Sequence, residues 1–243
     1  MERIDRAIIL AAGCGKRFYE KYPDTPKPLI PLNDRPMITY PIMNFINYGI
    51  KKLAIVIKES DVSIKNILAG YFAGISIEYF IQKVPEGTSR ALLCAGKYIE
   101  NESFFMTYCD NIGNYDLEKL NETFVRNDYM GVAVITDNPE NPGTAEADIR
   151  EDKINFIYEK PAENISRWKI SALYAFHPEF FKYLKDQKRS LTGEYEIANA
   201  INNAISSGED IGYIVDNSKR VNLNSPDDIP KASTLLKQKG LRG

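Results

Sequence analysis

The stretch RAIILAAGCGKRF, residues 6–18, decides the fold, because a short apolar run leads directly into a loop with two glycines and two cations. The run Arg6–Ala11 predicts a buried β-strand. Glycines at the carboxyl end of a parallel strand allow backbone N–H groups to approach a phosphate closely. Lys16 and Arg17 add positive charge at the same place. The stretch therefore predicts an α/β fold with a phosphate-binding loop after its first strand.

Two common phosphate loops do not match this stretch. The GxGxxG fingerprint of dinucleotide-binding proteins needs a third glycine where this chain has Phe18, which disfavours a nicotinamide-dependent oxidoreductase. The GxxxxGK[ST] loop fails because Arg17 follows Lys16 and no glycine lies five residues before Gly15. The loop is thus a phosphate cradle of another kind.

The first half of the chain alternates apolar strands with amphipathic helices. We expect further strands over residues 52–57, 75–81, 103–108 and 131–136. Helices are expected over residues 37–48, 61–69, 89–99 and 116–126, with Asp61 as the cap of the second and Gly70 as its end. This βαβα order predicts a mostly parallel sheet covered by helices on both faces.

The second half has a different pattern. Strand-like segments are expected over residues 146–150, 154–158, 170–176, 211–215 and 220–223, and helices over residues 180–186, 194–206 and 226–239. No repeat, low-complexity tract or linker interrupts the chain. We therefore expect one domain, residues 1–243, with a Rossmann-like mixed, mainly parallel sheet and a small β-rich extension.

Composition excludes several classes of protein. Lys and Arg number 31 against 33 Asp and Glu, without a block of like charge, which argues against nucleic-acid binding. Cys14, Cys94 and Cys109 are widely spaced, as expected of reduced thiols in a cytoplasmic protein without a disulfide framework or zinc site. The apolar run near the N-terminus is too short for a signal peptide or a membrane span. A single histidine, His177, disfavours serine–histidine chemistry.

A second motif, TPKPLIPL at residues 25–32, holds Lys27 between two prolines. Proline restricts its own backbone and that of the preceding residue, which suits a cation that must point in one direction. In isolation, a surface loop with a solvated lysine would be the favoured explanation of the motif.

Together, these two motifs resemble the LAAGxGxRx and PKPLxP signature of the sugar-nucleotide pyrophosphorylases, which are nucleotidyltransferases. Five further segments resemble the family in the same order along the chain. They are Gln82 with PEGT at 85–88, FMTYCDN at 105–111, YEKP at 158–161, and the late pair GEYEI at 193–197 and NLNSPDD at 222–228. This resemblance implies a nucleotide-diphospho-sugar transferase fold, with a nucleotide-binding half over about residues 1–112 and an acceptor-binding half over about residues 113–243.

The resemblance also implies an activity: Mg²⁺-dependent transfer of a nucleoside monophosphate from an NTP to a phosphorylated acceptor, by default a sugar 1-phosphate, with release of pyrophosphate. A phosphate monoester has a second pKa of about 6, so the nucleophile is already ionised at neutral pH and needs no general base. This accounts for a site without histidine.

By resemblance, the residues divide into three groups. Arg17 and Lys16 would hold the β- and γ-phosphates, Lys27 the α-phosphate and the acceptor phosphate, and Lys160 the acceptor phosphate. The nucleotide would contact Leu10, Ala11, Ala12, Gly13, Gly15, Lys16, Gln82, Gly87 and Thr88. The acceptor would contact Glu159, Lys160, Ser171 and Glu194, and Mg²⁺ would bind Asp110 with Asn222 or Asn224.

Two departures from the family leave the acceptor open. The second metal ligand of the family is usually an aspartate, whereas this chain offers Asn222 and Asn224. The family's Asn-Ala-Gly strand reads Ile170-Ser171-Ala172, which is more similar to short phosphocholine cytidylyltransferases. A cytidylyltransferase for phosphocholine or an amino-acid-derived phosphate is therefore an alternative, and a non-catalytic nucleotide-sugar-binding regulator is another. Gln82 favours a pyrimidine without excluding other bases, and a homo-oligomer remains open.

Overall fold

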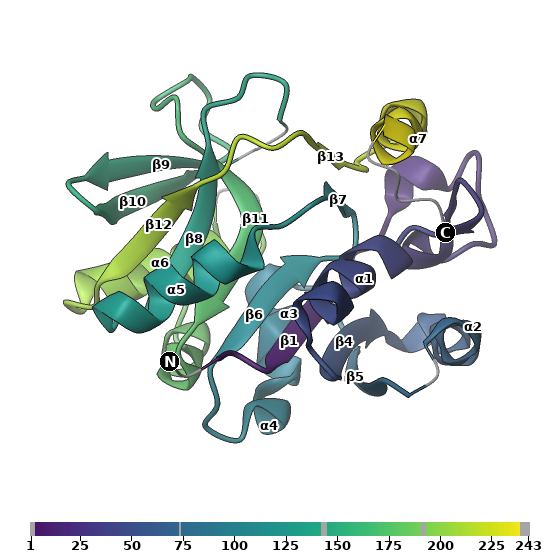
Figure 1. Ribbon diagram of the computed structural model, residues 1–243, viewed down its shortest axis with the longest axis horizontal. Helices are drawn as coiled ribbons and strands as arrows, with labels where there is room; N and C mark the ends of the chain where they lie inside the picture. Colours follow the sequence, from purple (N-terminus) through teal and green to yellow (C-terminus); the bar gives the residue numbers. More distant parts are fainter. Residues whose placement is uncertain (1–2, 73, 142–144, 191–192, 239–243) are drawn as a thin grey trace.

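A central nine-stranded sheet with helices on both faces forms the protein (Figure 1). The computed structural model describes residues 3–72, 74–141, 145–190 and 193–238. The strands of the sheet lie in the order β5-β4-β1-β6-β11-β8-β12-β10-β9. Their bounds are β1 Arg6–Leu10, β4 Lys52–Lys58, β5 Ser76–Gln82, β6 Phe104–Tyr108, β8 Gly131–Thr136, β9 Ala145–Arg150, β10 Lys153–Glu159, β11 Lys169–Phe176 and β12 Ile211–Val215.

Strand direction divides the sheet. β5, β4, β1 and β6 pair in parallel, as does β8 with β12. β11 runs antiparallel to both β6 and β8, and β10 runs antiparallel to both β9 and β12. The expected mixed sheet with a β-rich extension is therefore confirmed. Since a single sheet continues from β5 to β9, both halves of the chain contribute to it.

Two hydrophobic cores cover the two faces of this sheet. Side chains alternate along β1, so that Ile8 and Leu10 join one core while Ala7 and Ile9 join the other. The first core is covered by α3 Thr88–Cys94, α4 Gly96–Ile99 and α6 Ile197–Ser206, and the second by α1 Thr39–Tyr48, α2 Ser63–Tyr71 and α5 Leu117–Asn127. All five β1 residues are buried, as expected of a central parallel strand.

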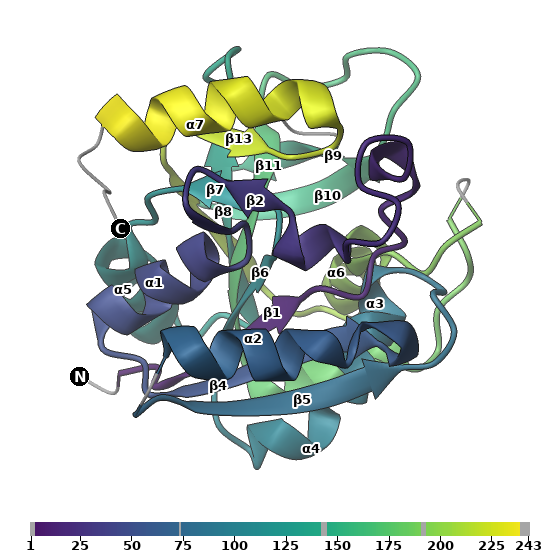
Figure 2. The same cartoon turned by 90° about the vertical axis from the view of Figure 1, so that its right-hand side faces the viewer.

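A third core lies beside the sheet, where α7 Ile229–Gln238 packs over the loop that follows β1 (Figure 2). Phe18, Ile30 and Leu223 meet there with 0–2% exposure. Two short ladders support this region: β2 Pro31–Leu32 with β3 Arg35–Pro36, and β7 Asn111–Gly113 with β13 Arg220–Asn222. The late strand β13 is thereby held next to the end of β6.

Several expected helix boundaries are wrong. Asp61 is not a helix cap; it lies in the 3₁₀ helix Glu59–Asp61, where its carboxylate accepts from Ser60 and pairs with Lys58 at 3.4 Å. Gly70 does not end α2, which continues to Tyr71 because Ile64 and Leu68 hold it on the sheet. The helix expected over residues 89–99 is two helices, separated at Ala95.

Two later helices also differ from expectation. The segment expected as a helix over residues 180–186 is a 3₁₀ helix, Pro178–Leu184. α6 begins only at Ile197, so Glu194 lies in a bend before it and not in its first turn. The terminal helix begins as a 3₁₀ turn at Pro226 and becomes α-helical at Ile229; its expected last residue, Lys239, lies outside the described residues.

Within the described ranges, every helix is too short or too polar to cross a membrane.

We expect Phe105→Ala to lower the free energy of unfolding by about 3–5 kcal/mol, because its ring is completely buried beneath α1. The ring lies 6.1 Å from Phe45 and 5.3 Å from Tyr48, centroid to centroid. Phe156→Ala is the matched control, since Phe156 is 40% exposed on β10, and it should cost about 1 kcal/mol. Urea denaturation measures both. Equal losses would contradict the placement of Phe105 in the core.

Candidate active site

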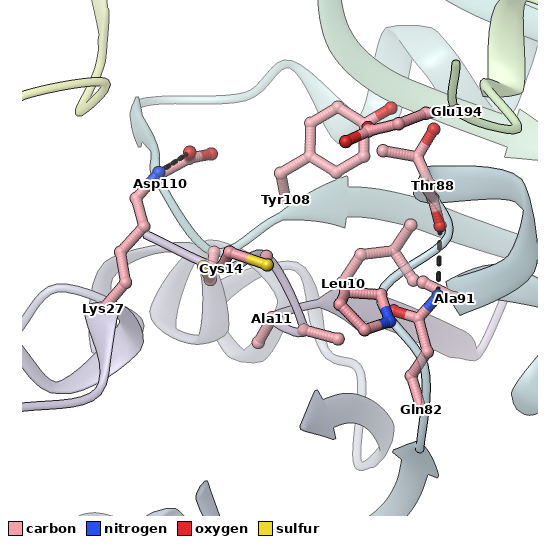
Figure 3. Close-up of a pocket in the computed structure, with 15 residues that line it drawn as sticks. Leu10, Ala11, Cys14, Lys27, Gln82, Thr88, Ala91, Tyr108, Asp110 and Glu194 are labelled. Atoms are coloured by element: carbon pink, nitrogen blue, oxygen red, sulfur yellow. Dashed lines mark hydrogen bonds and ion pairs between the residues drawn. The ribbon is translucent and has the colours of Figure 1, made fainter. Parts of the chain in front are cut away.

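Two adjoining cavities open at the carboxyl ends of β1 and β6. The first has a volume of about 260 Å³ and is lined by Leu10, Ala11, Ala12, Gly13, Cys14, Lys27, Gln82, Pro85, Gly87, Thr88, Ala91, Tyr108, Cys109, Asp110 and Glu194 (Figure 3). The second has a volume of about 330 Å³ and is lined by Arg17, Thr88, Tyr108, Asp110, Ala145, Glu159, Lys160, Ile170, Ala172, Tyr174, Glu194, Glu196, Ile197, Ala198, Asn222 and Asn224. Four residues line both cavities: Thr88, Tyr108, Asp110 and Glu194.

The loop after β1 is held at both ends. Ala11 N donates to Val56 O at 2.8 Å, and Phe18, at 2% exposure, anchors the 3₁₀ helix Lys16–Phe18 in the third core. Gly15 has φ 63°, and a Cβ there would lie 2.9 Å from the Cβ of Lys27. Glycine at this position therefore allows the two motifs of the sequence signature to pack directly against each other.

Lys27 and Asp110 form an ion pair across the first cavity, as Figure 3 shows. Both side chains are largely buried, at 14% and 20% exposure. Burial disfavours the charge on Lys27, but the attraction of Asp110 outweighs it and raises the lysine pKa above its ordinary value. Lys27 therefore remains a cation beside the cavity. An entering phosphate would compete with Asp110 for it.

β13 and the residues after it bring the side-chain amides of Asn222 and Asn224 to the cavity that Asp110 lines. Leu223 N donates to Asp110 O at 3.0 Å, and Asn222 lies opposite Asn111 in the β7–β13 ladder. Asp110, Asn222 and Asn224 consequently line the second cavity together. Among the described residues, no group of three His, Cys, Asp or Glu side chains could hold a metal alone. One carboxylate with amide oxygens still suits Mg²⁺, which commonly takes one or two carboxylates and completes its shell with substrate phosphates and water.

Gln82 closes the other side of the first cavity, where its buried amide donates to Gly87 O at 3.3 Å. Gly87 has φ 113°, and a Cβ there would lie 2.6 Å from Tyr195 O. Two backbone hydrogen bonds of 2.8 Å join this loop to Tyr195, one from Tyr195 N to Glu86 O and one from Ser89 N to Tyr195 O. The loop around Gly87 is thus fastened to the segment that carries Glu194.

A cluster of carboxylates surrounds Lys160 in the second cavity. Lys160 Nζ lies 3.5 Å from Glu196 Oε1 and 3.8 Å from Glu159 Oε1. Thr88 Oγ1 donates to Glu196 Oε2 at 3.1 Å and accepts from Ile197 N at 3.0 Å. Glu196 was not among the expected site residues, although it stands in the GEYEI motif. Glu196 reaches this position because the segment before α6 is hydrogen-bonded to the start of α3, where Ser89 N donates to Tyr195 O.

The structure places most of the expected site residues at the two cavities, with three exceptions. Gly15 and Lys16 line neither cavity, and the Lys16 side chain is exposed. Ser171 also lines neither cavity; its hydroxyl is buried without a hydrogen-bond partner in the described part of the chain. The β11 residues that do line the second cavity are Ile170, Ala172 and Tyr174. Pro85, Ala91, Tyr108 and Glu196 are lining residues that the sequence did not indicate.

Glu159 has a pKa raised to about 7, first by burial and then by the nearby Glu196 carboxylate. A carboxyl group whose pKa rises on folding costs more free energy to ionise in the folded protein than in the unfolded chain. The folded protein therefore binds more protons than the unfolded chain between about pH 4.5 and 7, and its stability falls as the pH rises through this window.

We expect the free energy of unfolding of Glu159→Gln to rise relative to that of the wild type as the pH increases. Between about pH 4 and pH 8 this difference should change by up to about 3 kcal/mol. The neutral amide avoids the cost of ionisation. Urea denaturation of both proteins at the two pH values measures the difference. A difference that does not change with pH would show that Glu159 is not held in this environment.

Comparison with known proteins agrees with this geometry. A family model described as nucleotidyl transferase matches residues 6–237. A glucose-1-phosphate thymidylyltransferase of Neisseria meningitidis is 32% identical over 199 residues, which cover 80% of this chain and 69% of that protein. The UTP–glucose-1-phosphate uridylyltransferase AglF of Haloferax volcanii is 28% identical over 239 residues, which cover 96% of this chain and 97% of that protein.

The fold agrees as well. A crystal structure from Bacillus anthracis, assigned as a glucose-1-phosphate thymidylyltransferase, matches with a TM-score of 0.83 at 26% identity, over 95% of this chain and 94% of that one. These findings confirm the resemblance inferred from the sequence motifs. The chain belongs to the nucleotidyl transferase family, whose members transfer a nucleoside monophosphate from a nucleoside triphosphate to a small phosphorylated acceptor and release pyrophosphate.

Proposed function

We propose that this enzyme joins a nucleoside monophosphate to a small phosphorylated acceptor, by default a sugar 1-phosphate, with Mg²⁺ as the cofactor and a pyrimidine nucleoside triphosphate as the donor. The observation that carries the proposal is that Asp110 lines both cavities while Lys27 is paired with it. In this proposal, the junction of the two cavities is where the α-phosphate of a nucleotide would meet the phosphate of an acceptor, and a cation beside a carboxylate suits the binding of phosphate and Mg²⁺ there.

In this proposal the first cavity holds the nucleotide. Main-chain groups of residues 10–13 and 87 would contact the base and sugar, and Gln82 would pair with the polar edge of the base. An amide offers both a donor and an acceptor, as a pyrimidine edge requires. The related enzymes that transfer thymidylyl and uridylyl groups support this preference.

The phosphates would lie between the loop after β1 and the β7–β13 ladder. Arg17 lines the second cavity and Lys16 does not, so we assign the leaving pyrophosphate to Arg17. Lys27 would leave Asp110 to bind the α-phosphate, and Asp110 with Asn222 or Asn224 would bind Mg²⁺. The metal would neutralise negative charge on the phosphates during transfer.

The acceptor would occupy the second cavity, with its phosphate on Lys160 and its body against Glu159, Glu194 and Glu196. A phosphate monoester is mostly a dianion at neutral pH, so its oxygen can attack without a general base. The main work of the site is then to hold two polyanions close together in the right orientation. His177 lines neither cavity, which agrees with this mechanism.

Three further assignments belong to the proposal. Residues 1–112 form the nucleotide-binding half and residues 113–243 the acceptor-binding half of one domain. The enzyme works in the cytoplasm, which the free thiols of Cys14, Cys94 and Cys109 support. A homo-oligomer is compatible with this function and is tested by light scattering.

We expect pyrophosphate release only when an NTP, Mg²⁺ and a phosphorylated acceptor are all present. The decisive experiment incubates the protein with each of four NTPs against a panel of phosphorylated acceptors and measures pyrophosphate. Release that does not depend on the acceptor would mean NTP hydrolysis and would contradict the proposal, as would no release with any pair.

We expect Asp110→Asn to lower turnover at least about 100-fold, because the metal loses its only carboxylate ligand in the proposed set. Asp128→Asn is the matched control, since Asp128 lies at the end of α5 with φ 52°, a conformation that asparagine tolerates well. The control should retain full activity. An Asp110→Asn enzyme with unchanged turnover and unchanged Mg²⁺ dependence would remove the metal assignment.

We expect Arg17→Ala to lower kcat/KM about 100-fold or more, whereas Lys16→Ala should lower it less than about 10-fold. The reason is geometric: of these neighbouring cations, only Arg17 lines a cavity. Steady-state kinetics with saturating Mg²⁺ measure both variants. Equal effects of the two substitutions would contradict the assignment of the pyrophosphate to Arg17.

A further inference from the structure

The wall that β11 contributes to the second cavity is apolar. Ile170 and Ala172 line the cavity there. Ala172 has φ 55°, at the irregular pairing between β11 and β8, so its methyl group occupies a position where glycine would leave space. Neither side chain can form a hydrogen bond with a ligand.

The backbone carbonyls of this wall are also engaged. Ser171 O accepts from Asn111 Nδ2 at 2.7 Å, and Ala172 O accepts from Thr107 Oγ1 at 2.9 Å. The Tyr174 hydroxyl, further along the strand, is bonded to Tyr108. A sugar hydroxyl directed at Ile170 and Ala172 would therefore exchange its water for methyl groups, which disfavours binding.

The same cavity also offers hydrogen-bond acceptors. Glu159, Glu194 and Glu196 line it, and ionised carboxylates only accept hydrogen bonds. The charged groups around the cavity are Arg17 and Lys160 against Asp110, Glu194 and Glu196, together with Glu159, which is about half ionised near neutral pH because burial and Glu196 raise its pKa to about 7. Lys160 contacts Glu159 and Glu196 and partly neutralises their negative charge. If an acceptor phosphate draws Lys160 toward itself, these carboxylates lose that neutralising charge. A positively charged group on the acceptor would replace it.

We propose that the natural acceptor is a phosphate monoester that carries an ammonium group, directs this group at the three glutamates, and presents hydrocarbon to Ile170 and Ala172. This inference rests on the proposed nucleotidyl transfer and narrows its acceptor. An aminoalkyl phosphate and an amino-sugar 1-phosphate share the required chemistry. The apolar wall makes Ile170 and Ala172 the residues that determine specificity.

The first test compares four acceptors by kcat/KM for pyrophosphate release: phosphocholine, its neutral isostere 3,3-dimethylbutyl phosphate, glucosamine 1-phosphate and glucose 1-phosphate. We expect one of the two ammonium compounds to exceed its neutral counterpart by about 10-fold or more. The counterparts are the isostere for phosphocholine and glucose 1-phosphate for glucosamine 1-phosphate. Which ammonium compound is preferred identifies the source of the acceptor.

The outcomes separate this inference from the proposed function. Efficient release with glucose 1-phosphate, equal to or better than with every ammonium compound, would overturn the inference and leave the nucleotidyl transfer in place. The inference would also be overturned if phosphocholine and its neutral isostere had equal kcat/KM values and glucosamine 1-phosphate was not preferred over glucose 1-phosphate. No release with any of the four acceptors and any NTP would overturn both.

The second test changes the wall. Ile170→Asn should raise the ratio of kcat/KM for glucose 1-phosphate to that for the preferred ammonium compound by about 10-fold, because the amide supplies a partner for a hydroxyl. Ile170→Val, the matched control, should leave the ratio within about 3-fold. Partial unfolding lowers both activities equally and does not change a ratio. An unchanged ratio in Ile170→Asn would overturn the role of the wall.

Discussion

The parallel pairing of β1 with β6 places Leu10 opposite Tyr108, and both the glycine loop and Asp110 follow directly after this contact. Cys109 N donates to Leu10 O at 3.0 Å, so the two chains leave the sheet side by side. One continues into the glycine loop and the other into Asp110. Because both strands are buried on both faces, neither can shift in register without exposing apolar side chains to water.

The third core extends this arrangement to parts of the chain that are distant in sequence. Phe18 and Ile30 pack with Leu223 near the end of β13, more than half of the chain away from them. The β7–β13 ladder then sets Asn222 beside Asn111, adjacent to Asp110. α7 covers this core, so the terminal helix stabilises the phosphate loop without contributing a residue to either cavity.

The two cavities differ in how they are built. The first cavity, proposed for the nucleotide, is lined by several small residues of the loop after β1, together with Gln82 and the Lys27–Asp110 pair. The second cavity, proposed for the acceptor, includes residues of α6, of β10 and of the irregular part of β11, which carries Ile170 and Ala172 where the family resemblance implies asparagine and glycine. The differences from the family are therefore concentrated where the acceptor would bind, and the shared residues where the nucleotide would bind.

The sequence by itself determined the α/β class, the alternation of the first half and the glycine loop of residues 10–18, because these depend on local patterns of apolar residues and glycine. Lys27 and Asp110 were indicated by the resemblance to the family and not by a local pattern. The sequence could not show that Glu196 pairs with Lys160, that Ser171 lines neither cavity, or that Arg17 and not Lys16 lines one of them. Those facts depend on the bulge in β11, on the non-helical segment before α6, and on contacts between residues far apart in the chain. Only the tertiary packing determines these positions. A one-residue change in strand register turns a side chain to the other face of the sheet, and a one-residue change in the start of a helix rotates it around the helix axis, while the sequence pattern stays the same.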